Sequence, residues 1–386
     1  MKAKTMSGSD PAKKTVMILA NSSGGLYDFR NELVQKLLQE YHVVASLPDT
    51  VKTELLAKEG VIIEHTPINR RGMNPAQDLS LVHAYELLMK KYRPDLVLTY
   101  TIKPNVYGGF VCRKMGIPYL STITGLGSTF QKSGPLLFLV ERMYYEGLKK
   151  ASCVFFQNEE NRQIFRRGGL VSGRDRLVPG SGVNTKVWQA MPYPKDEVTN
   201  FLFVGRVMKE KGIEEFFRAA EVLHSEKILF SICGYCDEDY QGELDERASR
   251  GEILQLGFHP DMHEYYRDCS AVVMPTWHEG MSNVLMEASA CARPVIASNI
   301  SGCREIFEDG VTGYGFAPHS PEELIRTLRH FLTLDRSQRA AMGEAARQKM
   351  IEEFDREKVA AAYLEEIHAA MEEPKEDSGK KGNSET

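Results

Sequence analysis

The 386-residue chain has no apolar run long enough to cross a bilayer. Runs such as Leu136–Val140 fall far short of the ~20 residues that a membrane-spanning helix needs. Residues 1–14 are basic and polar and contain no apolar core of the kind found in signal peptides, so we expect a flexible leader there. These absences together predict a protein of the cytoplasm.

Cysteine is scarce, and its spacing is irregular. Several of the seven cysteines lie inside apolar runs, which is typical of reduced core thiols and excludes a disulfide scaffold. Cys233 and Cys236 form a single CxxC that has neither a second pair nor a nearby histidine. We therefore expect no metal site, and a core thiol pair is the simpler interpretation of the CxxC.

A strong overall charge is also missing, because the formal net charge is −5 and the pI is near 6.1. General nucleic-acid binding is thereby disfavoured. Residues 1–190 nevertheless carry 26 Lys and Arg against 16 Asp and Glu (+10), and the remainder carries 22 against 37 (−15). A basic half suits an anionic membrane surface or phosphorylated lipids, although the same charge spread thinly over a solvated surface would have no such role.

What the chain does contain is a strand–helix alternation that runs twice. Such alternation predicts two α/β domains, each a parallel sheet covered by helices, with a ligand cleft where the carboxyl ends of the strands face each other. We place the first domain at 15–190 and the second at 195–350, joined by a Gly- and Pro-marked linker near 179–194. The predicted strands are Val16–Ala20, His42–Leu47, Val61–Glu64, Asp95–Tyr100, Pro118–Thr122, Cys153–Gln157, Phe201–Gly205, Ile228–Gly234, Ile253–Leu256, Ala271–Pro275, Pro294–Ser298 and Gly313–Phe316.

A long helical pattern follows, Ala340–Met371, and it breaks near Phe354-Asp355. The break would let a terminal helix at 351–371 return to the first domain. Residues 372–386 are polar and charged and contain no aromatic side chain, so we expect a disordered tail.

The most informative stretch is Thr276–Cys291, TWHEGMSNVLMEASAC. Glu279 and Gly280 lie in a polar loop, Ser282 and Asn283 are good helix N-cap residues, and Glu287 falls inside the helix among small or apolar side chains. The free N–H groups of a helix start, placed between two acids, offer an anion site flanked by hydroxyl acceptors, which suits a nucleoside diphosphate sugar. Alternatively, Glu279 is a loop charge and Glu287 a satisfied core acid.

A second cationic turn precedes this stretch in the same domain. Arg206 and Lys211 follow the predicted strand Phe201–Gly205, and Gly205 and Gly212 flank them. Two cations at a strand-to-helix turn would neutralise a diphosphate leaving group, unless they are solvated loop charges.

These motifs, together with Pro294–Ala297 and Gly302–Gly313, resemble the retaining GT-B glycosyltransferases of glycosyltransferase family 4. The resemblance implies two Rossmann-like domains facing across a cleft, a nucleotide-sugar donor in the second domain, an acceptor in the first, and no metal or other cofactor. It further implies that Arg206 and Lys211 hold the diphosphate, that Glu279 contacts the donor sugar, and that Glu287 binds the ribose. The remaining implied donor contacts are Gly280, the backbone amides near Met281 to Asn283, and a Gly24-Gly25 turn. This turn would let donor and acceptor phosphate approach the backbone, although it could also be an ordinary tight turn.

The first domain resembles bacterial enzymes that extend undecaprenyl-diphosphate-linked saccharides, including N-acetylgalactosaminyl and galacturonosyl transferases. The residues that carry this likeness are Tyr100–Asn105 and Thr124–Ser128. Lys103, Arg70 and Arg71 are candidate contacts for acceptor phosphates, with Thr124 and Gly125 beside them, although the two arginines could be a plain surface pair. Leu136–Tyr145 could rest on lipid as an amphipathic helix or belong to the core.

Some positions depart from the family pattern. The loop at Thr124 lacks the histidine that many relatives carry, so no catalytic base is assigned, and Ala292 and the Tyr235-Cys236 segment replace usual glycines.

The prediction is a retaining hexosyltransferase that uses a UDP-sugar and a lipid-linked saccharide at the inner face of the cell membrane. The alternatives are a sugar-nucleotide epimerase or hydrolase of the same fold, and a non-catalytic nucleotide-sugar-binding partner of a polysaccharide assembly complex.

Overall fold

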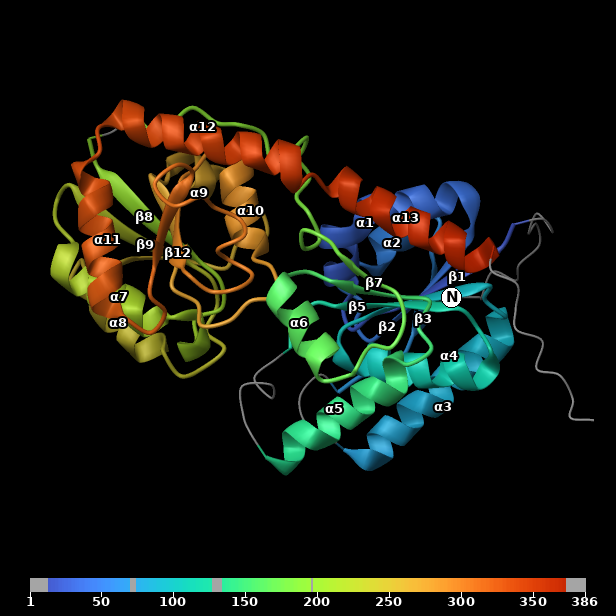
Figure 1. Ribbon diagram of the computed structural model, residues 1–386. Helices are drawn as coiled ribbons and strands as arrows, with labels where there is room; N and C mark the ends of the chain where they lie inside the picture. The colour runs from blue at the N-terminus through green and yellow to red at the C-terminus, as the bar shows by residue number, and fades with distance from the viewer. Residues whose placement is uncertain (1–12, 70–73, 127–133, 196, 373–386) are drawn as a thin grey trace, which may run out of the picture.

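Two parallel sheets, each covered by helices, form the two halves of the molecule (Figure 1). This computed structural model describes residues 13–69, 74–126, 134–195 and 197–372. The sheet of the first domain has the strand order β3-β2-β1-β4-β5-β6-β7. Its strands are β1 (Thr15–Leu19), β2 (His42–Leu47), β3 (Ile62–His65), β4 (Leu96–Tyr100), β5 (Tyr119–Ile123), β6 (Cys153–Phe156) and β7 (Asp175–Leu177).

Strand β1 shows why both faces of this sheet are covered. Val16 and Ile18 enter one apolar cluster, and Met17 and Leu19 enter another on the opposite face. Successive side chains of a strand point to opposite faces, so a continuous apolar run needs a helix layer on each side. Those layers are built from α1 (Ser23–Glu40), α2 (Thr53–Glu59), α3 (Pro75–Tyr92), the π-helix η1 (Pro104–Gly108), α4 (Gly109–Met115), α5 (Pro135–Leu148) and α6 (Glu159–Arg167).

The second domain repeats this logic with the strand order β10-β9-β8-β11-β12-β13. Phe201 and Phe203 of β8 enter one cluster, and Leu202 and Val204 enter the other. The elements are β8 (Thr199–Val204), η3 (Lys209–Lys211), α7 (Ile213–Leu223), β9 (Ile228–Cys233), α8 (Gln241–Ser249), β10 (Leu254–Gly257), α9 (His263–Asp268), β11 (Ala271–Met274), α10 (Asn283–Ala290), β12 (Val295–Ser298), β13 (Gly313–Phe316) and α11 (Pro321–Thr333).

Two consecutive helices tie the domains together. Helix α12 (Arg336–Glu353) lies on the second domain, the chain bends at Phe354-Asp355, and α13 (Arg356–Glu372) lies beside α1 on the first domain (Figure 1). Val359, Tyr363 and Ile367 of α13 belong to the same apolar cluster as Val16 and Ile18 of β1. The last described helix is therefore part of the first domain's core.

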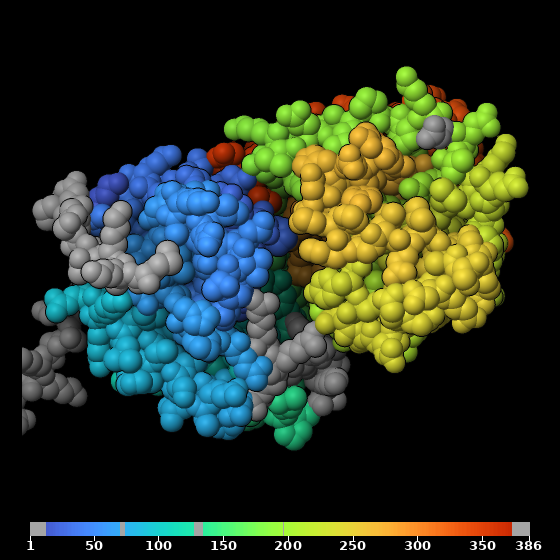
Figure 2. Space-filling view, turned by 180° about the vertical axis from the view of Figure 1, so that it is seen from behind, coloured from blue at the N-terminus to red at the C-terminus, as the bar shows by residue number. Residues whose placement is uncertain are grey.

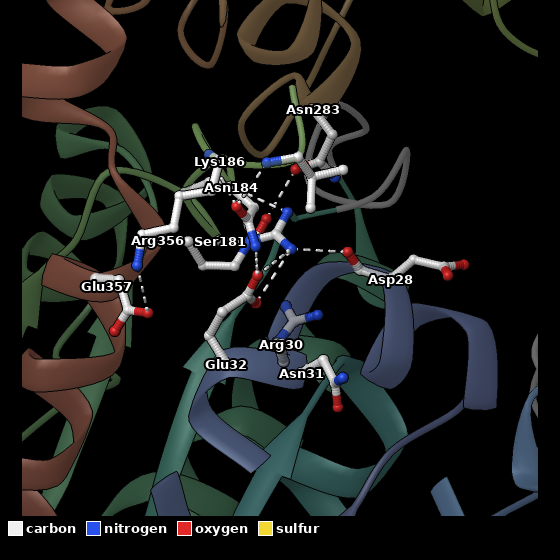
Figure 3. Close-up of polar contacts among 12 residues, drawn as sticks. Asp28, Arg30, Asn31, Glu32, Ser181, Asn184, Lys186, Asn283, Arg356 and Glu357 are labelled. Atoms are coloured by element: carbon white, nitrogen blue, oxygen red, sulfur yellow. Dashed lines mark hydrogen bonds and ion pairs between the residues drawn. The ribbon is translucent and has the colours of Figure 1, made fainter. Parts of the chain in front are cut away.

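A buried ion pair marks the point where the chain crosses back. The guanidinium of Arg356 lies 3.2 Å from the Glu32 carboxylate on α1, and its Nη1 donates to the Asp28 carbonyl at 2.9 Å (Figure 3). Asn184 of the linker donates to the same Glu32 carboxylate at 2.6 Å. The side chains of Arg356 and Glu32 are 7% and 14% exposed. First domain, linker and terminal helix thus meet at one cluster.

The main local differences from the sequence predictions lie near the ends of β1 and β4. The predicted Gly24-Gly25 turn is wrong, because α1 already begins at Ser23 and both glycines lie in its first turn. The physical reason is the cap: the Ser22 hydroxyl accepts a hydrogen bond from the Gly25 amide, which starts the helix directly after β1. The short strand β7 was not predicted, nor was the π-helix after β4.

Helix α5 reconciles the two interpretations of its apolar sequence. Its beginning is exposed, with Phe138 72% and Leu136 49% accessible, whereas Tyr144, Gly147 and Leu148 near its end are buried. The helix is therefore a core element at one end and an apolar surface at the other. Within the described ranges, no helix combines the length and the apolarity needed to cross a bilayer.

Candidate active site between the two domains

A cavity of about 260 Å³ opens between the two domains. The space-filling view shows the two lobes meeting along a furrow (Figure 2). Both domains and the linker contribute side chains to the cavity wall. The lining residues are Ala20, Asn21, Ser22, Gly25, Leu26, Phe29, Arg30, Tyr100, Thr101, Thr124, Gln157, Ser181, Glu279, Gly280, Met281 and Asn283.

The first-domain wall includes residues of α1 and a set of residues that follow the carboxyl ends of parallel strands. Asn21 follows β1, Thr101 follows β4, Thr124 follows β5 and Gln157 follows β6. Open α/β folds bind ligands at this edge of the sheet. Of these residues, only Thr124 was among the predicted site residues. A search for polar residues directly after each predicted strand would have found Asn21 and Thr101, whereas Gln157 was predicted to be the last residue of its strand.

Glu279 and Lys211 form an ion pair at the second-domain wall. Their side chains are 15% and 21% exposed, and Lys211 ends the short helix η3. Gly212 allows this arrangement, since it has φ of 73° and a Cβ there would lie 2.0 Å from the Pro275 carbonyl oxygen. The turn that carries Lys211 is thereby held against Pro275, the residue that follows β11.

Arg206 also has a carboxylate partner, although a different one. Its Nη1 donates to Asp237 at 2.6 Å, and its side chain is 41% exposed. Arg206 follows Gly205 at the carboxyl end of β8, and Asp237 lies in the loop after β9. Sequence reasoning identified the two cations and Glu279, but neither the pairing of Glu279 with Lys211 nor Asp237 as the partner of Arg206.

The start of α10 offers fewer free amides than predicted. Ser282 is the N-cap, and its hydroxyl accepts from the Leu285 amide at 3.4 Å. The Ser282 amide donates to the Gly302 carbonyl at 2.9 Å, so it is not a free N–H group in this structure, and its binding to phosphate stays a prediction. Asn283 lines the cavity, and its side chain accepts a hydrogen bond from Ser181 of the linker at 2.7 Å. Met281 is buried and lines the same cavity.

Glu287 lies on α10 and is not among the residues that line the cavity. Its carboxylate accepts a hydrogen bond from the buried Tyr266 hydroxyl at 3.2 Å. Burial raises the pKa of Glu287 to about 7, and the nearby Asp28 carboxylate acts in the same direction, against Tyr266, Arg356 and His263. Burial likewise raises the pKa of Asp28. The carboxyl group of Glu287 therefore has a pKa close to neutral pH.

Gly280 brings the two domains into direct contact. A Cβ at this position would lie 1.8 Å from the Thr124 carbonyl oxygen, so only glycine permits this approach. Asn158, the N-cap of α6, donates to the Gly280 carbonyl at 2.6 Å. Gly125 packs against Gly280 as well. The predicted donor residue Gly280 and the predicted acceptor residues Thr124 and Gly125 therefore meet.

The other predicted contacts lie elsewhere. Gly24 lines a neighbouring surface hollow, not the cavity between the domains. Lys103 lies in a separate cavity of about 560 Å³ in the first domain, where its ammonium is 2.7 Å from the Asp78 carboxylate in a largely buried pair. Lys103 is therefore paired with an acid, as Lys211 and Arg206 are, and its contact with acceptor phosphates stays a prediction. Arg70 and Arg71 lie outside the described residues.

The residues that the structure describes contain no group of three or more His, Cys, Asp or Glu side chains able to hold a metal ion. Their cysteines are free thiols, Cys233 and Cys236 included. What the cavity presents instead is an arginine, an acid paired with a lysine, hydroxyl and amide side chains, and a helix start. Such a set can hold an anion next to a group rich in hydroxyls.

Comparison with known families divides the chain as the two sheets do. Residues 16–158 match the family described as glycosyl transferase 4-like, and residues 189–349 match glycosyl transferases group 1. Among curated proteins, the chain is 24% identical over 366 residues to the N,N'-diacetylbacillosaminyl-diphospho-undecaprenol alpha-1,3-N-acetylgalactosaminyltransferase of Campylobacter jejuni. That match covers 90% of this chain and 96% of the relative.

Solved structures share the whole fold. HepE of Anabaena, in complex with UDP and glucose, superposes with a TM-score of 0.76 at 19% identity, covering 92% of this chain and 99% of the other. Sucrose-phosphate synthase of Thermosynechococcus elongatus gives a TM-score of 0.77 at 19% identity, covering 93% of this chain and 100% of the other. The chain therefore belongs to the GT-B glycosyltransferases, with a glycosyl transferase 4-like first domain and a glycosyl transferases group 1 second domain.

Proposed function

We propose that this glycosyltransferase moves a hexose, an N-acetylhexosamine or a hexuronic acid from a UDP-sugar to an undecaprenyl-diphosphate-linked saccharide, with retention at the anomeric carbon and without a metal. The observation that carries the proposal is the cavity whose wall includes Glu279, Gly280 and Asn283 from one domain and Thr124 from the other. Support for the acceptor class comes from the Campylobacter jejuni relative, whose name specifies a diphospho-undecaprenol substrate. Support for the donor class comes from HepE, whose complex holds UDP.

In this proposal the second domain binds the donor. Arg206 and Lys211 stabilise the charge that develops on the diphosphate as the bond between the anomeric carbon and the phosphate oxygen breaks. Glu279 accepts hydrogen bonds from sugar hydroxyls, and Glu287 accepts them from the ribose. The acceptor hydroxyl oxygen forms the new bond on the same face of the sugar, and its proton passes to the departing phosphate oxygen, so UDP is released.

A donor panel tests this function directly. UDP- and GDP-sugars are incubated with short-chain polyprenyl-diphosphate saccharides, and the products are read by mass spectrometry, with NMR of the product to assign the anomer. We expect a UDP-sugar to be consumed only when acceptor is present, equally well with and without EDTA. Donor consumption without acceptor would favour an epimerase or hydrolase, and nucleotide binding without turnover would favour a binding partner.

The same proposal places the enzyme at the cytoplasmic membrane surface. Exposed apolar side chains of α5 and α3, among them Phe138 and Leu79 at 72% and 70% accessibility, lie on the first domain, which carries the positive charge excess. We expect co-sedimentation with vesicles containing anionic lipid to fall in Phe138→Ser and to persist in Phe258→Ser, a control on the second domain that is 64% exposed. Equal sedimentation of both variants with the parent would contradict the membrane contact.

A further inference from the structure

Arg30 on α1 is a cleft cation without a carboxylate partner among the described residues. Its Nη1 donates to the Gly25 carbonyl at 3.0 Å, and its guanidinium lies 4.5 Å from the centre of the Tyr100 ring. Lys211 and Arg206, the two predicted donor-site cations of the second domain, are each paired with an acid. Arg30 therefore retains a positive charge that no described carboxylate neutralises.

The position of Arg30 is fixed from two sides. It lies in the second turn of α1, and Tyr100, on which it stacks, is the last residue of β4. Stacking of a guanidinium on an aromatic face leaves the planar edge of N–H donors available. Figure 3 shows Arg30 beside the Glu32–Arg356 pair, and no dashed contact joins it to that pair. The side chain is thus preorganised for an outside partner and is not engaged in the domain junction.

A group that binds to Arg30 must enter the cavity between the domains, because Arg30 lines that cavity. Arg30 lines that cavity together with Glu279 and Asn283, and the beginning of α1 lies in the same wall through Ser22 and Gly25. The start of an 18-residue helix adds positive potential at this point. A fork of N–H donors beside a helix start is suited to phosphate oxygens, which accept two parallel hydrogen bonds from one guanidinium.

We propose that Arg30 binds a phosphate group of a substrate from the first-domain side of the cleft. This inference rests on the proposed function, and it assigns to that function a residue that the donor-site motifs do not contain. The phosphate belongs either to the diphosphate of the donor, which would then be clamped between the domains, or to the diphosphate of the lipid-linked acceptor. Arg30 is a binding residue in both cases, and the two sources differ in which substrate depends on it.

The test compares Arg30→Gln, which removes the charge, with Arg30→Lys, which keeps it. Arg326→Gln is the matched control, because Arg326 is exposed on α11 and paired with Glu323. Calorimetry measures the affinity of each protein for UDP and for uridine, which lacks phosphate. Steady-state assays measure KM for a short-chain polyprenyl-diphosphate saccharide at saturating donor. Thermal melting confirms that each variant is folded.

If Arg30 holds the donor, Arg30→Gln weakens UDP binding by about tenfold or more, leaves uridine binding unchanged, and Arg30→Lys restores part of the loss. If it holds the acceptor, UDP binding is unchanged and the acceptor KM rises by a similar factor. The inference is overturned if the parent turns over substrate while Arg30→Gln matches it in both constants, or if UDP and uridine weaken equally. A parent that binds no UDP and turns over no donor would overturn the proposed function itself.

Discussion

Lys211 and Glu279 neutralise each other at the cavity wall, so a diphosphate that binds here competes with a carboxylate for the ammonium group. Under the proposed function, a phosphate that displaced Glu279 from Lys211 would free the Glu279 carboxylate to accept hydrogen bonds from the sugar that the phosphate carries. One ion pair can in this way respond to both ends of a nucleotide sugar.

The first prediction concerns the charge on this lysine. Lys211→Met should lower turnover at saturating donor by about two orders of magnitude, because an ammonium that stabilises the departing diphosphate acts mainly in the transition state. Single-turnover assays measure the effect. Lys209→Met is the control, since Lys209 belongs to the same turn but is 54% exposed and paired with Glu214. Near-normal turnover of Lys211→Met would refute the role.

The second prediction concerns how Glu287 makes the stability of the protein depend on pH. Its pKa is raised from an ordinary 4.5 to about 7 in the folded protein, so folding favours the protonated form. The stabilisation is complete below pH ~4.5 and is lost as pH rises to ~7, by up to a few kcal/mol. Urea unfolding at pH 5 and pH 7.5 should therefore show Glu287→Gln gaining stability relative to the parent at the higher pH. The same difference at both pH values would contradict the assignment.

At the level of residues, the sequence predicted site residues that lie together in one short motif. It missed the hydrogen-bond and ion-pair partners that lie in loops after distant strands. Glu279 and Asn283 share a loop and a helix start, so their proximity is local. Asp237 lies 31 residues from Arg206, and Tyr266 lies 21 residues from Glu287. No spacing rule links such pairs, because only the order of the strands in the sheet places their loops side by side.

Helices and strands were predictable where their sequences were amphipathic or uniformly apolar. The strands His42–Leu47 and Gly313–Phe316 have the predicted bounds, because each is a short stretch rich in β-branched or aromatic residues. Strand β7 reads Asp-Arg-Leu, which carries no strand signal of its own, and it forms because β6 offers it an edge. The early start of α1 depends on the Ser22 cap, which was missed because the Gly24-Gly25 pair favoured the prediction of a turn.

The loop before α10 leads to the third prediction. Gly280→Ala should reduce kcat/KM by about a hundredfold, because a methyl group 1.8 Å from the Thr124 carbonyl must displace the loop from the first domain. Gly242→Ala is the matched control, since a Cβ there meets nothing within 4 Å. Activity assays and thermal melting on both variants check this. Unchanged activity in Gly280→Ala would mean that the contact does not position the site.

On the scale of the whole molecule, the two domains are connected twice, by the linker and by the helix pair α12–α13. Each connection passes the same cluster, in which Glu32 accepts from Asn184 of the linker and pairs with Arg356 of the terminal helix. The sequence indicated a break at Phe354-Asp355 but not the ion pair, because Glu32 and Arg356 are 324 residues apart. The cluster thus joins both connections to α1 of the first domain.

The fourth prediction tests how much the ion pair of this cluster stabilises the protein. Arg356→Met should destabilise the protein by about 3–5 kcal/mol, because it leaves the Glu32 carboxylate buried without its cation. Adding Glu32→Gln should restore much of the loss, since the uncompensated charge is then gone, and urea unfolding of the parent, both single variants and the double variant forms the cycle. Lys36→Met is the control at the same junction, where the pair with Glu357 is exposed and worth less than ~1 kcal/mol. If the losses of the two single variants simply add in the double variant, Glu32 and Arg356 are not coupled, and the crossing of the chain is held by the apolar contacts of α13 alone.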